Sequence, residues 1–132
     1  MTFILDTDTI IYWLKGNEDI ERKVIKIGLP NIGIAVLTCC ELYYGAYKSK
    51  RIQANLMVIE KLKQKIKIIH TSDEVDKNFG RIKATLESYG TPLDDSDMLI
   101  ASIVISNKAT LVTNNIRHFK RIEGLKVENW IE

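Results

Sequence analysis

Short hydrophobic runs alternate along the chain with longer stretches in which apolar residues recur every three or four positions. The short runs are rich in β-branched or aliphatic residues, which favours β-strands at residues 2–5, 31–36, 66–69, 110–112 and 126–128. The longer stretches have the spacing of amphipathic helices, at residues 10–14, 20–28, 42–47, 52–66 and 72–89. Gly28 and Pro30 mark the end of the second of these helices, and Gly90 with Pro92 ends the last.

Residues 98–105 differ from these helices because they are apolar on nearly every side. A helix of that kind is buried on several sides, and strands that are hydrophobic on both faces are typical of a parallel sheet covered by helices. The alternation therefore predicts a three-layer α/β/α fold around a central parallel sheet of about five strands. Since no internal repeat, linker or low-complexity segment interrupts the pattern, we expect residues 1–132 to form a single domain.

The composition is that of an ordinary globular protein, with 45% hydrophobic and 27% charged residues. No apolar run approaches the roughly 18 residues of a membrane span, and no secretory leader pattern opens the sequence. The adjacent Cys39 and Cys40 are expected to be two small buried hydrophobes rather than a disulfide or a zinc pair. These features predict a cytoplasmic protein that does not bind a membrane.

The net charge of +2 is too small to indicate a polyanionic partner by itself, but the basic residues are unevenly placed. They form three clusters: Lys48, Lys50 and Arg51; Lys61, Lys63, Lys65 and Lys67; and Arg117, His118, Lys120 and Arg121. Clusters of this kind are usually solvated faces, and contact with nucleic acid is the alternative.

Polar side chains follow the predicted strands at the points where those strands end. Asp6 closes the first strand, Glu41 is expected in the first turn of the helix after the second strand, and Asp97 in the first turn of the buried helix. The fourth strand leads into Thr113 and Asn115. Because ligands of open parallel sheets bind at the carboxyl ends of the strands, we expect these four segments to direct polar side chains to one edge.

Each acid also has a structural explanation as a cap or a favourable charge at a helix N-terminus. The residues concerned are Asp8 for the first helix, the Thr38-x-x-Glu41 capping box for the helix after the second strand, and Asp94, Asp95 and Asp97 for the buried helix. Capping does not require Asp6 at the end of a strand, nor a carboxylate on the most hydrophobic helix. A shared role explains the acids better as a group.

Carboxylates that are crowded into one cleft repel one another, and burial raises the cost of keeping them ionised. A divalent cation relieves both effects, and an all-oxygen ligand set suits Mg²⁺ or Mn²⁺ rather than zinc. His70 and His118 are too isolated in the sequence to form a ligand pair. The chain also lacks the nucleophile elbow of serine hydrolases and a glycine-rich phosphate loop.

Four segments carry a family resemblance: Asp6 in "LDTD", Glu41 in "TCCEL", Asp97 in "DMLIASIV", and "LVTNNIRHF". With the closing "GLKVENWIE", they resemble the PIN-domain nucleases, specifically the VapC toxins of bacterial and archaeal toxin–antitoxin pairs, over essentially the whole chain. The resemblance implies a metal centre formed by Asp6, Glu41 and Asp97, with Thr113 matching the threonine after the fourth strand. It implies an endoribonuclease toxin that uses Mg²⁺ or Mn²⁺ to hydrolyse RNA, including structured targets such as tRNA.

The same resemblance implies two protein partners. One is a cognate VapB-type antitoxin that blocks the acidic edge, and the other is a second copy of the chain in a homodimer. The dimer interface could involve Tyr43, Tyr44 and Tyr47, although a helix face packed in the core explains these tyrosines equally well.

One position departs from the family pattern. Many PIN domains have a fourth acid two residues after the threonine, where this chain has Asn115. An amide can coordinate or donate a hydrogen bond but brings no charge, which weakens the case for a tightly held second metal in the free protein. Asp94 and Asp95 are the candidate substitutes.

Two other functions stay open. "FILDTDT" also matches the haloacid dehalogenase-type phosphatases, in which Asp6 would be the nucleophile and Asp8 the general acid, with Thr71 supplying a hydroxyl. That scheme leaves Glu41 without a role, and a chain of 132 residues has little room for the cap elements of those enzymes. A non-catalytic binding module is the third alternative, since a fold does not fix a function.

Overall fold

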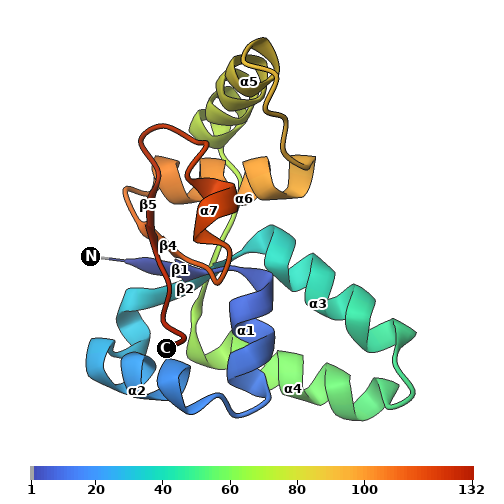
Figure 1. Ribbon diagram of the computed structural model, residues 1–132. Helices are drawn as coiled ribbons and strands as arrows, with labels where there is room; N and C mark the ends of the chain where they lie inside the picture. The colour runs from blue at the N-terminus through green and yellow to red at the C-terminus, as the bar shows by residue number, and fades with distance from the viewer. Residues whose placement is uncertain (1) are drawn as a thin grey trace.

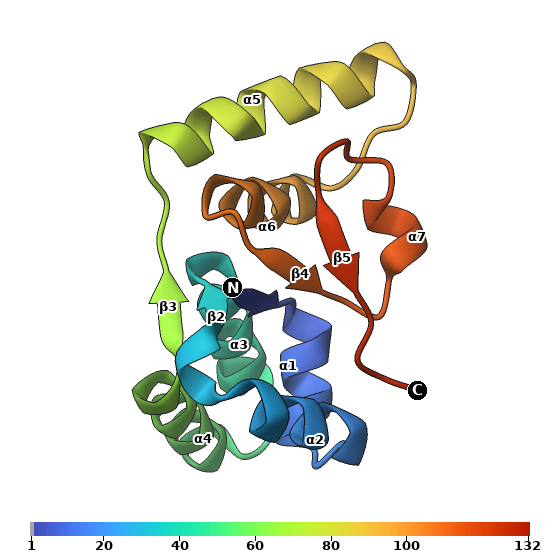
Figure 2. The ribbon, with the colours of Figure 1, turned by 90° about the vertical axis from the view of Figure 1, so that its left-hand side faces the viewer.

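A computed structural model describes residues 2–132 and shows a five-stranded parallel sheet in the order β3-β2-β1-β4-β5 (Figure 2). The strands are β1 (Phe3–Leu5), β2 (Ile32–Ala35), β3 (Lys67–Ile69), β4 (Thr110–Val112) and β5 (Lys126–Glu128). The five predicted strands are confirmed, and three of them are one residue shorter at one or both ends. The chain builds one side of the sheet first and then crosses to the other side of β1 for the last two strands.

Helices cover both faces of this sheet and give the expected three-layer arrangement (Figure 1). On one face lie α1 (Thr7–Leu14), α2 (Glu18–Ile27), α3 (Val36–Lys48) and α4 (Ile52–Lys65). On the other lie α5 (Asp73–Ser88), α6 (Asp95–Ser106) and the short α7 (Ile116–Phe119). A 3₁₀ turn, η1 (Leu29–Asn31), leads from α2 into β2. Across residues 2–132, no helix combines the length and the apolar character that crossing a bilayer requires.

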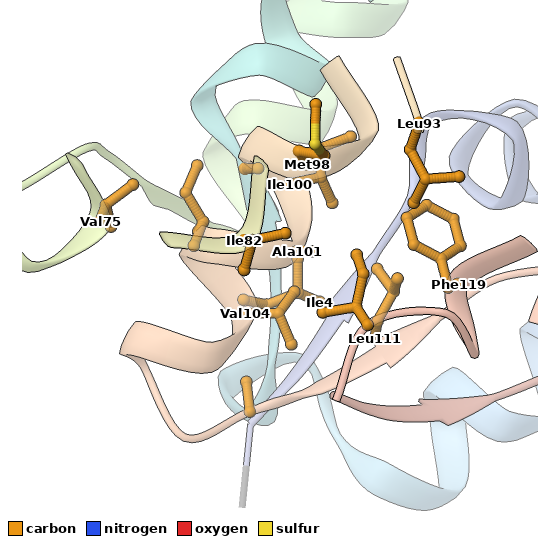
Figure 3. Packing of buried hydrophobic residues seen from close by; sticks show 14 of the residues in the cluster. Ile4, Val75, Ile82, Leu93, Met98, Ile100, Ala101, Val104, Leu111 and Phe119 are labelled. Atoms are coloured by element: carbon orange, nitrogen blue, oxygen red, sulfur yellow. The ribbon is translucent and has the colours of Figure 1, made fainter. Parts of the chain in front are cut away.

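The two hydrophobic cores follow the alternation of side chains along the strands. Successive residues of a strand point to opposite faces, so Ile4 and Leu111 face the core under α5 and α6, whereas Leu5 and Val112 face the core under α1–α4. Figure 3 shows the first of these cores, in which Ile4, Leu111 and Phe119 lie together with side chains of α6. The sheet is therefore buried on both faces, as the apolar strands predict.

The helix α6 is the all-round buried helix that the sequence predicts. Its buried residues are Met98, Ile100, Ala101, Ser102, Ile103 and Val104. The fully buried hydroxyl of Ser102 donates to the carbonyl oxygen of Met98 at 2.6 Å, which satisfies the one polar side chain in this set. Because packing holds α6 from several sides, the position of its first turn is fixed as well.

The helix α3 divides its side chains differently from our expectation. Cys39 is buried but Cys40 is exposed, because neighbouring residues on a helix point about 100° apart and only one of them can face the core. The expectation of two buried cysteines is therefore wrong, although both thiols are free as predicted. Tyr44 and Tyr47 are 66% and 63% exposed, so they do not belong to the core-facing side of the helix.

Leu111→Ala tests the core beneath α6. Leu111 is fully buried, so truncation removes apolar burial and leaves a cavity, which should lower the free energy of unfolding by about 2–5 kcal/mol. Urea unfolding followed by circular dichroism measures this loss. Ile25→Ala is the control, since Ile25 is 72% exposed on α2, and it should change the value by less than about 0.5 kcal/mol. Similar losses in both variants would contradict the core described above.

Candidate active site

The candidate site lies where the strand order reverses, between β1 and β4. From β1 the chain first builds β2 and β3 on one side, and it later builds β4 and β5 on the other. In open α/β sheets, ligands bind at the carboxyl ends of the strands beside such a reversal. The helices α1 and α3 begin at this edge because they follow β1 and β2 directly. The helix α6 also begins there, because a helix that leads into a parallel strand runs back against it.

Asp6 directly follows β1 and is the N-cap of α1. Its carboxylate accepts a hydrogen bond from the backbone N–H of Thr9 at 2.9 Å, and the hydroxyl of Thr113 hydrogen-bonds to the same carboxylate. Capping by Asp8 was one structural alternative, and it is wrong because Asp6 is the cap and Asp8 lies exposed in the first turn. Only 8% of Asp6 is exposed, and this burial raises the pKa of its carboxyl, while the hydrogen bonds from Thr113 and Thr9 partly offset the rise.

Glu41 is held from another helix rather than at its own helix start. The helix α3 begins at Val36 with Ala35 as its N-cap, because β2 passes into the helix without an intervening residue. Glu41 therefore lies in the second turn, and both the first-turn placement and the capping box with Thr38 are wrong. Its carboxylate oxygen Oε1 instead accepts a hydrogen bond of 2.6 Å from the hydroxyl of Thr7, the first residue of α1.

Thr7 is a site residue that the sequence reasoning missed. Its hydroxyl also lies 3.2 Å from the hydroxyl of Thr38, which is fully buried. A hydroxyl has one proton, and the carboxylate of Glu41 is the stronger acceptor, so Thr7 donates to Glu41 and Thr38 donates to Thr7. The signal in the sequence was a hydroxyl residue directly after Asp6, but no local pattern shows that it reaches α3.

Asp97 lies in the first turn of α6, as predicted, and pairs with a histidine. Its carboxylate oxygen Oδ2 is 2.8 Å from Nε2 of His118, and the two side chains are 27% and 26% exposed. The sequence left His118 isolated, because α7 reaches Asp97 only after the chain has passed through β4. Asp94 occupies the N-cap position of α6 without a side-chain cap bond, and Asp95 pairs with a lysine of α5 at 3.0 Å.

Thr113 and Asn115 lie at the same edge, at the end of β4. Thr113 is fully buried, and its hydroxyl oxygen accepts a hydrogen bond of 3.0 Å from the backbone N–H of Asn115. The backbone N–H of Thr113 donates to the carbonyl oxygen of Glu128 at 2.9 Å, which fixes this turn against β5. The side chain of Asn115 is exposed, so the position of the missing fourth acid opens to solvent.

These contacts form a series across the edge: Glu41 with Thr7, Asp6 with Thr113, Thr113 with Asn115, and His118 with Asp97. Thr7 follows Asp6 in the chain, and the backbone N–H of His118 donates to the carbonyl oxygen of Asn115 at 3.2 Å. Within residues 2–132, no three acidic, histidine or cysteine side chains form a ready-made metal site. Each predicted acid has a protein partner instead.

The donor chemistry of this edge nevertheless fits a hard divalent cation. The three acids offer carboxylate oxygens, which Mg²⁺ prefers. The contacts described above use Oε1 of Glu41 and Oδ2 of Asp97, and each carboxylate has a second oxygen that could coordinate. Because burial raises the pKa of Asp6, a positive charge beside it would favour its ionised form.

The arrangement does not suit the phosphatase alternative. That scheme needs Thr71 beside Asp6, but Thr71 follows β3, the edge strand, and β2 separates β3 from β1. Two strand spacings amount to roughly 10 Å. Asp8, the general acid of that scheme, is exposed on α1.

Comparison with known proteins identifies the family of this chain. The family described as "PIN domain" matches residues 3–125. The tRNA(fMet)-specific endonuclease VapC of Salmonella typhimurium is 33% identical over 130 residues, which cover 98% of either chain. Ribonuclease VapC2 of Rickettsia felis is 35% identical over 132 residues, again 98% of either chain.

Similar solved structures come from toxin–antitoxin complexes. A chain of VapBC2 from Rickettsia felis, bound to a DNA fragment from its promoter, matches with a TM-score of 0.93 and 34% identity over 98% of this chain and 99% of that one. A chain of VapBC-1 from nontypeable Haemophilus influenzae matches with a TM-score of 0.90 and 30% identity over 98% of both chains. The fold, the acidic edge and these full-length matches show that this chain belongs to the PIN-domain family and, within it, to the VapC ribonucleases of toxin–antitoxin systems.

Proposed function

We propose that this protein is a Mg²⁺- or Mn²⁺-dependent endoribonuclease that acts as the toxin of a toxin–antitoxin pair. The observation that carries the proposal is the series of contacts that leads from Glu41 through Asp6 to Asp97 along one sheet edge. Family membership supports RNA as the substrate over a non-catalytic role. A structured RNA such as tRNA is the substrate we favour, because a relative with 33% identity is named for tRNA(fMet).

Asp6, Glu41 and Asp97 are the residues that would hold the cation. A divalent ion bound there would neutralise charge on the scissile phosphate and lower the pKa of a bound water. Thr113 supports this set by its hydrogen bond to Asp6, and Asn115 in turn donates to Thr113. Because Asn115 brings no charge, three carboxylates rather than four define the site.

The reaction we propose is hydrolysis of an RNA phosphodiester. A water oxygen bonds to phosphorus in line with the bond to the 3′-oxygen, and that bond breaks. The water loses one proton and the departing 3′-oxygen gains one, so the products carry a 5′-phosphate and a 3′-hydroxyl. We assign the orientation of this water to Glu41, because Thr7 fixes its carboxylate.

A VapB-type antitoxin is the protein partner that we propose for the acidic edge. The solved relatives are toxin–antitoxin complexes, and three carboxylates at one edge favour a cationic inhibitor segment. An arginine from such a segment could bind a carboxylate with two hydrogen bonds. The homodimer implied by the family resemblance stays a prediction, which light scattering of the purified chain would test.

Asp6→Asn and Asp97→Asn should each abolish metal-dependent cleavage, because an amide cannot supply the negative charge. The assay incubates purified protein with total RNA and Mg²⁺, with or without EDTA, and maps the ends of any discrete product. Asp73→Asn is the matched control, since its side chain is an 84% exposed acid at the start of α5, and it should cut like the wild type.

Normal cleavage by either active-site variant would overturn this assignment. A divalent ion should also raise the Tm of the wild type but not that of Asp6→Asn, which gives a readout that is independent of activity. Hydrolysis of p-nitrophenyl phosphate without cleavage of RNA would favour a phosphatase instead.

Asp6→Asn should also raise the Tm at neutral pH when divalent ions are absent. Burial raises the pKa of Asp6 in the folded protein, so the native state binds this proton more tightly than the unfolded chain does. Stability is therefore lost as the pH rises from the ordinary carboxyl pKa through the raised folded pKa. Asparagine carries no charge at any pH. The Tm difference between Asp6→Asn and the wild type should therefore shrink as the pH falls from about 8 to about 4 in melts with EDTA. A less stable variant at neutral pH would contradict this account.

Thr7→Val should reduce cleavage by about 10–100-fold, because the side chain that orients Glu41 loses its hydroxyl. Thr7→Ser keeps the hydroxyl and should restore most of the rate. Initial rates on a mapped RNA target measure both variants, and Tm values show whether they are folded. Equal rates for the valine and serine variants would show that the hydrogen bond does not position Glu41.

A further inference from the structure

The outward face of α3 carries a row of side chains that begins at Glu41. Tyr44 and Lys48 follow it by three and seven residues, so the three side chains share one face of the helix. Tyr44 is 66% exposed, and the Nζ of Lys48 lies 5.5 Å from the centroid of its ring. We name Glu41, Tyr44, Gly45 and Lys48 the α3 ridge. Figure 1 shows α3 leading away from the sheet edge towards the loop into α4.

The charged residues that follow Glu41 on α3 and in the loop after it are all basic. Between Glu41 and Glu60 the chain has no acidic residue, and it has three basic ones, Lys48, Lys50 and Arg51. All three are exposed and lie at the far end of α3 or in the loop that follows. An exposed aromatic ring beside a basic cluster is the combination that binds single-stranded nucleic acid, because bases stack on the ring and phosphates pair with the cations. The charge also disfavours another basic surface as the occupant.

The α3 ridge has no side chain at its centre, where Gly45 lies. Gly45 is exposed inside the helix, and a Cβ added there would meet nothing within 4 Å, so packing within the chain does not require glycine. Glycine in a helix interior is unfavourable relative to alanine, but it lets another backbone approach closely. A groove of about 500 Å³ between α1, α3 and α4 runs alongside, and both Glu41 and Gly45 line it.

We propose that the α3 ridge, continued by Lys50 and Arg51, is the docking track for the single-stranded RNA that flanks the cleaved bond. A base stacks on Tyr44, the RNA backbone passes Gly45, and phosphates pair with Lys48 and the cations beyond it. The inference rests on the proposed function, since Glu41 connects the track to the acidic edge. It names Tyr44 as a substrate contact and the cluster at residues 48–51 as phosphate contacts.

The test measures binding separately from cleavage. The parent is Asp6→Asn with Mg²⁺, and the probe is a fluorescein-labelled oligoadenylate of roughly 12 nucleotides, followed by anisotropy. Adding Tyr44→Ala should weaken binding by roughly 5–150-fold, whereas Tyr44→Phe should keep most of the affinity. Tyr89→Ala is the matched control, because Tyr89 is 76% exposed at the end of α5 on the other face of the sheet, and it should bind like the parent.

Two further variants test the rest of the track. Lys48, Lys50 and Arg51 are replaced together by alanine in one variant. The slope of log affinity against log salt concentration should then become less steep by roughly 0.7 for each lost phosphate contact. Gly45→Ala should raise the Tm but weaken binding. Gly80→Ala in α5 is its control, because an added Cβ there also meets nothing within 4 Å, and it should raise the Tm without changing affinity.

Several results would overturn the track. One is a parent that does not bind the probe, and another is a Tyr44→Ala variant that binds like the parent. A third is a Tyr44→Ala variant that turns a dimer into a monomer in sedimentation without loss of RNA affinity, which would make the ridge an interface between copies. Failure of the proposed function looks different: the wild type cuts no RNA in Mg²⁺, while binding still depends on Tyr44.

Discussion

The buried carboxylate of Asp6 is the constraint on which the rest of the site depends. Asp6 directly follows β1, caps α1 through the backbone N–H of Thr9, and hydrogen-bonds to Thr113 across the point where the strand order reverses. These roles conflict, because burial favours the neutral acid whereas a cation site needs the charge. The hydrogen bonds from Thr9 and Thr113 reduce the conflict without removing it, since the pKa of Asp6 stays raised. The fold thus keeps the cost of burying this carboxylate at the position that the proposed cation site would use.

Helices place the other two acids at the same edge of the sheet. Glu41 stands in the second turn of α3, which follows β2 directly, and its position is set by the hydroxyls of Thr7 and Thr38. Asp97 stands in the first turn of α6, whose burial on several sides leaves that turn little freedom. The three acids therefore do not depend on long loops for their placement.

The sequence predicted local features well and contacts between segments poorly. Hydrophobic periodicity is local, so the strands could be predicted to within one residue at each end, and the buried part of α6 could be predicted although that helix begins three residues earlier. The edge could be predicted because parallel strands end together. The hydrogen bond from Thr7 to Glu41 joins residues 34 positions apart, and the pair of His118 and Asp97 joins residues 21 apart, which no short-range pattern records. The Thr38-x-x-Glu41 spacing suggested a capping box at a helix start, but it lies inside α3, which begins at Val36.

The helix α3 links chemistry to substrate binding if its ridge is the RNA track. Glu41 and Lys48 are seven residues apart on one helix, a rise of about 10 Å, which would separate the acidic edge from the nearest phosphate contact of the track. The bound phosphates would then stand at a fixed distance from the bond that is cut. Phosphate contacts position a substrate but do not read its sequence. Selectivity would therefore arise from the base on Tyr44 and from which single-stranded segments of a folded RNA can lie along the helix.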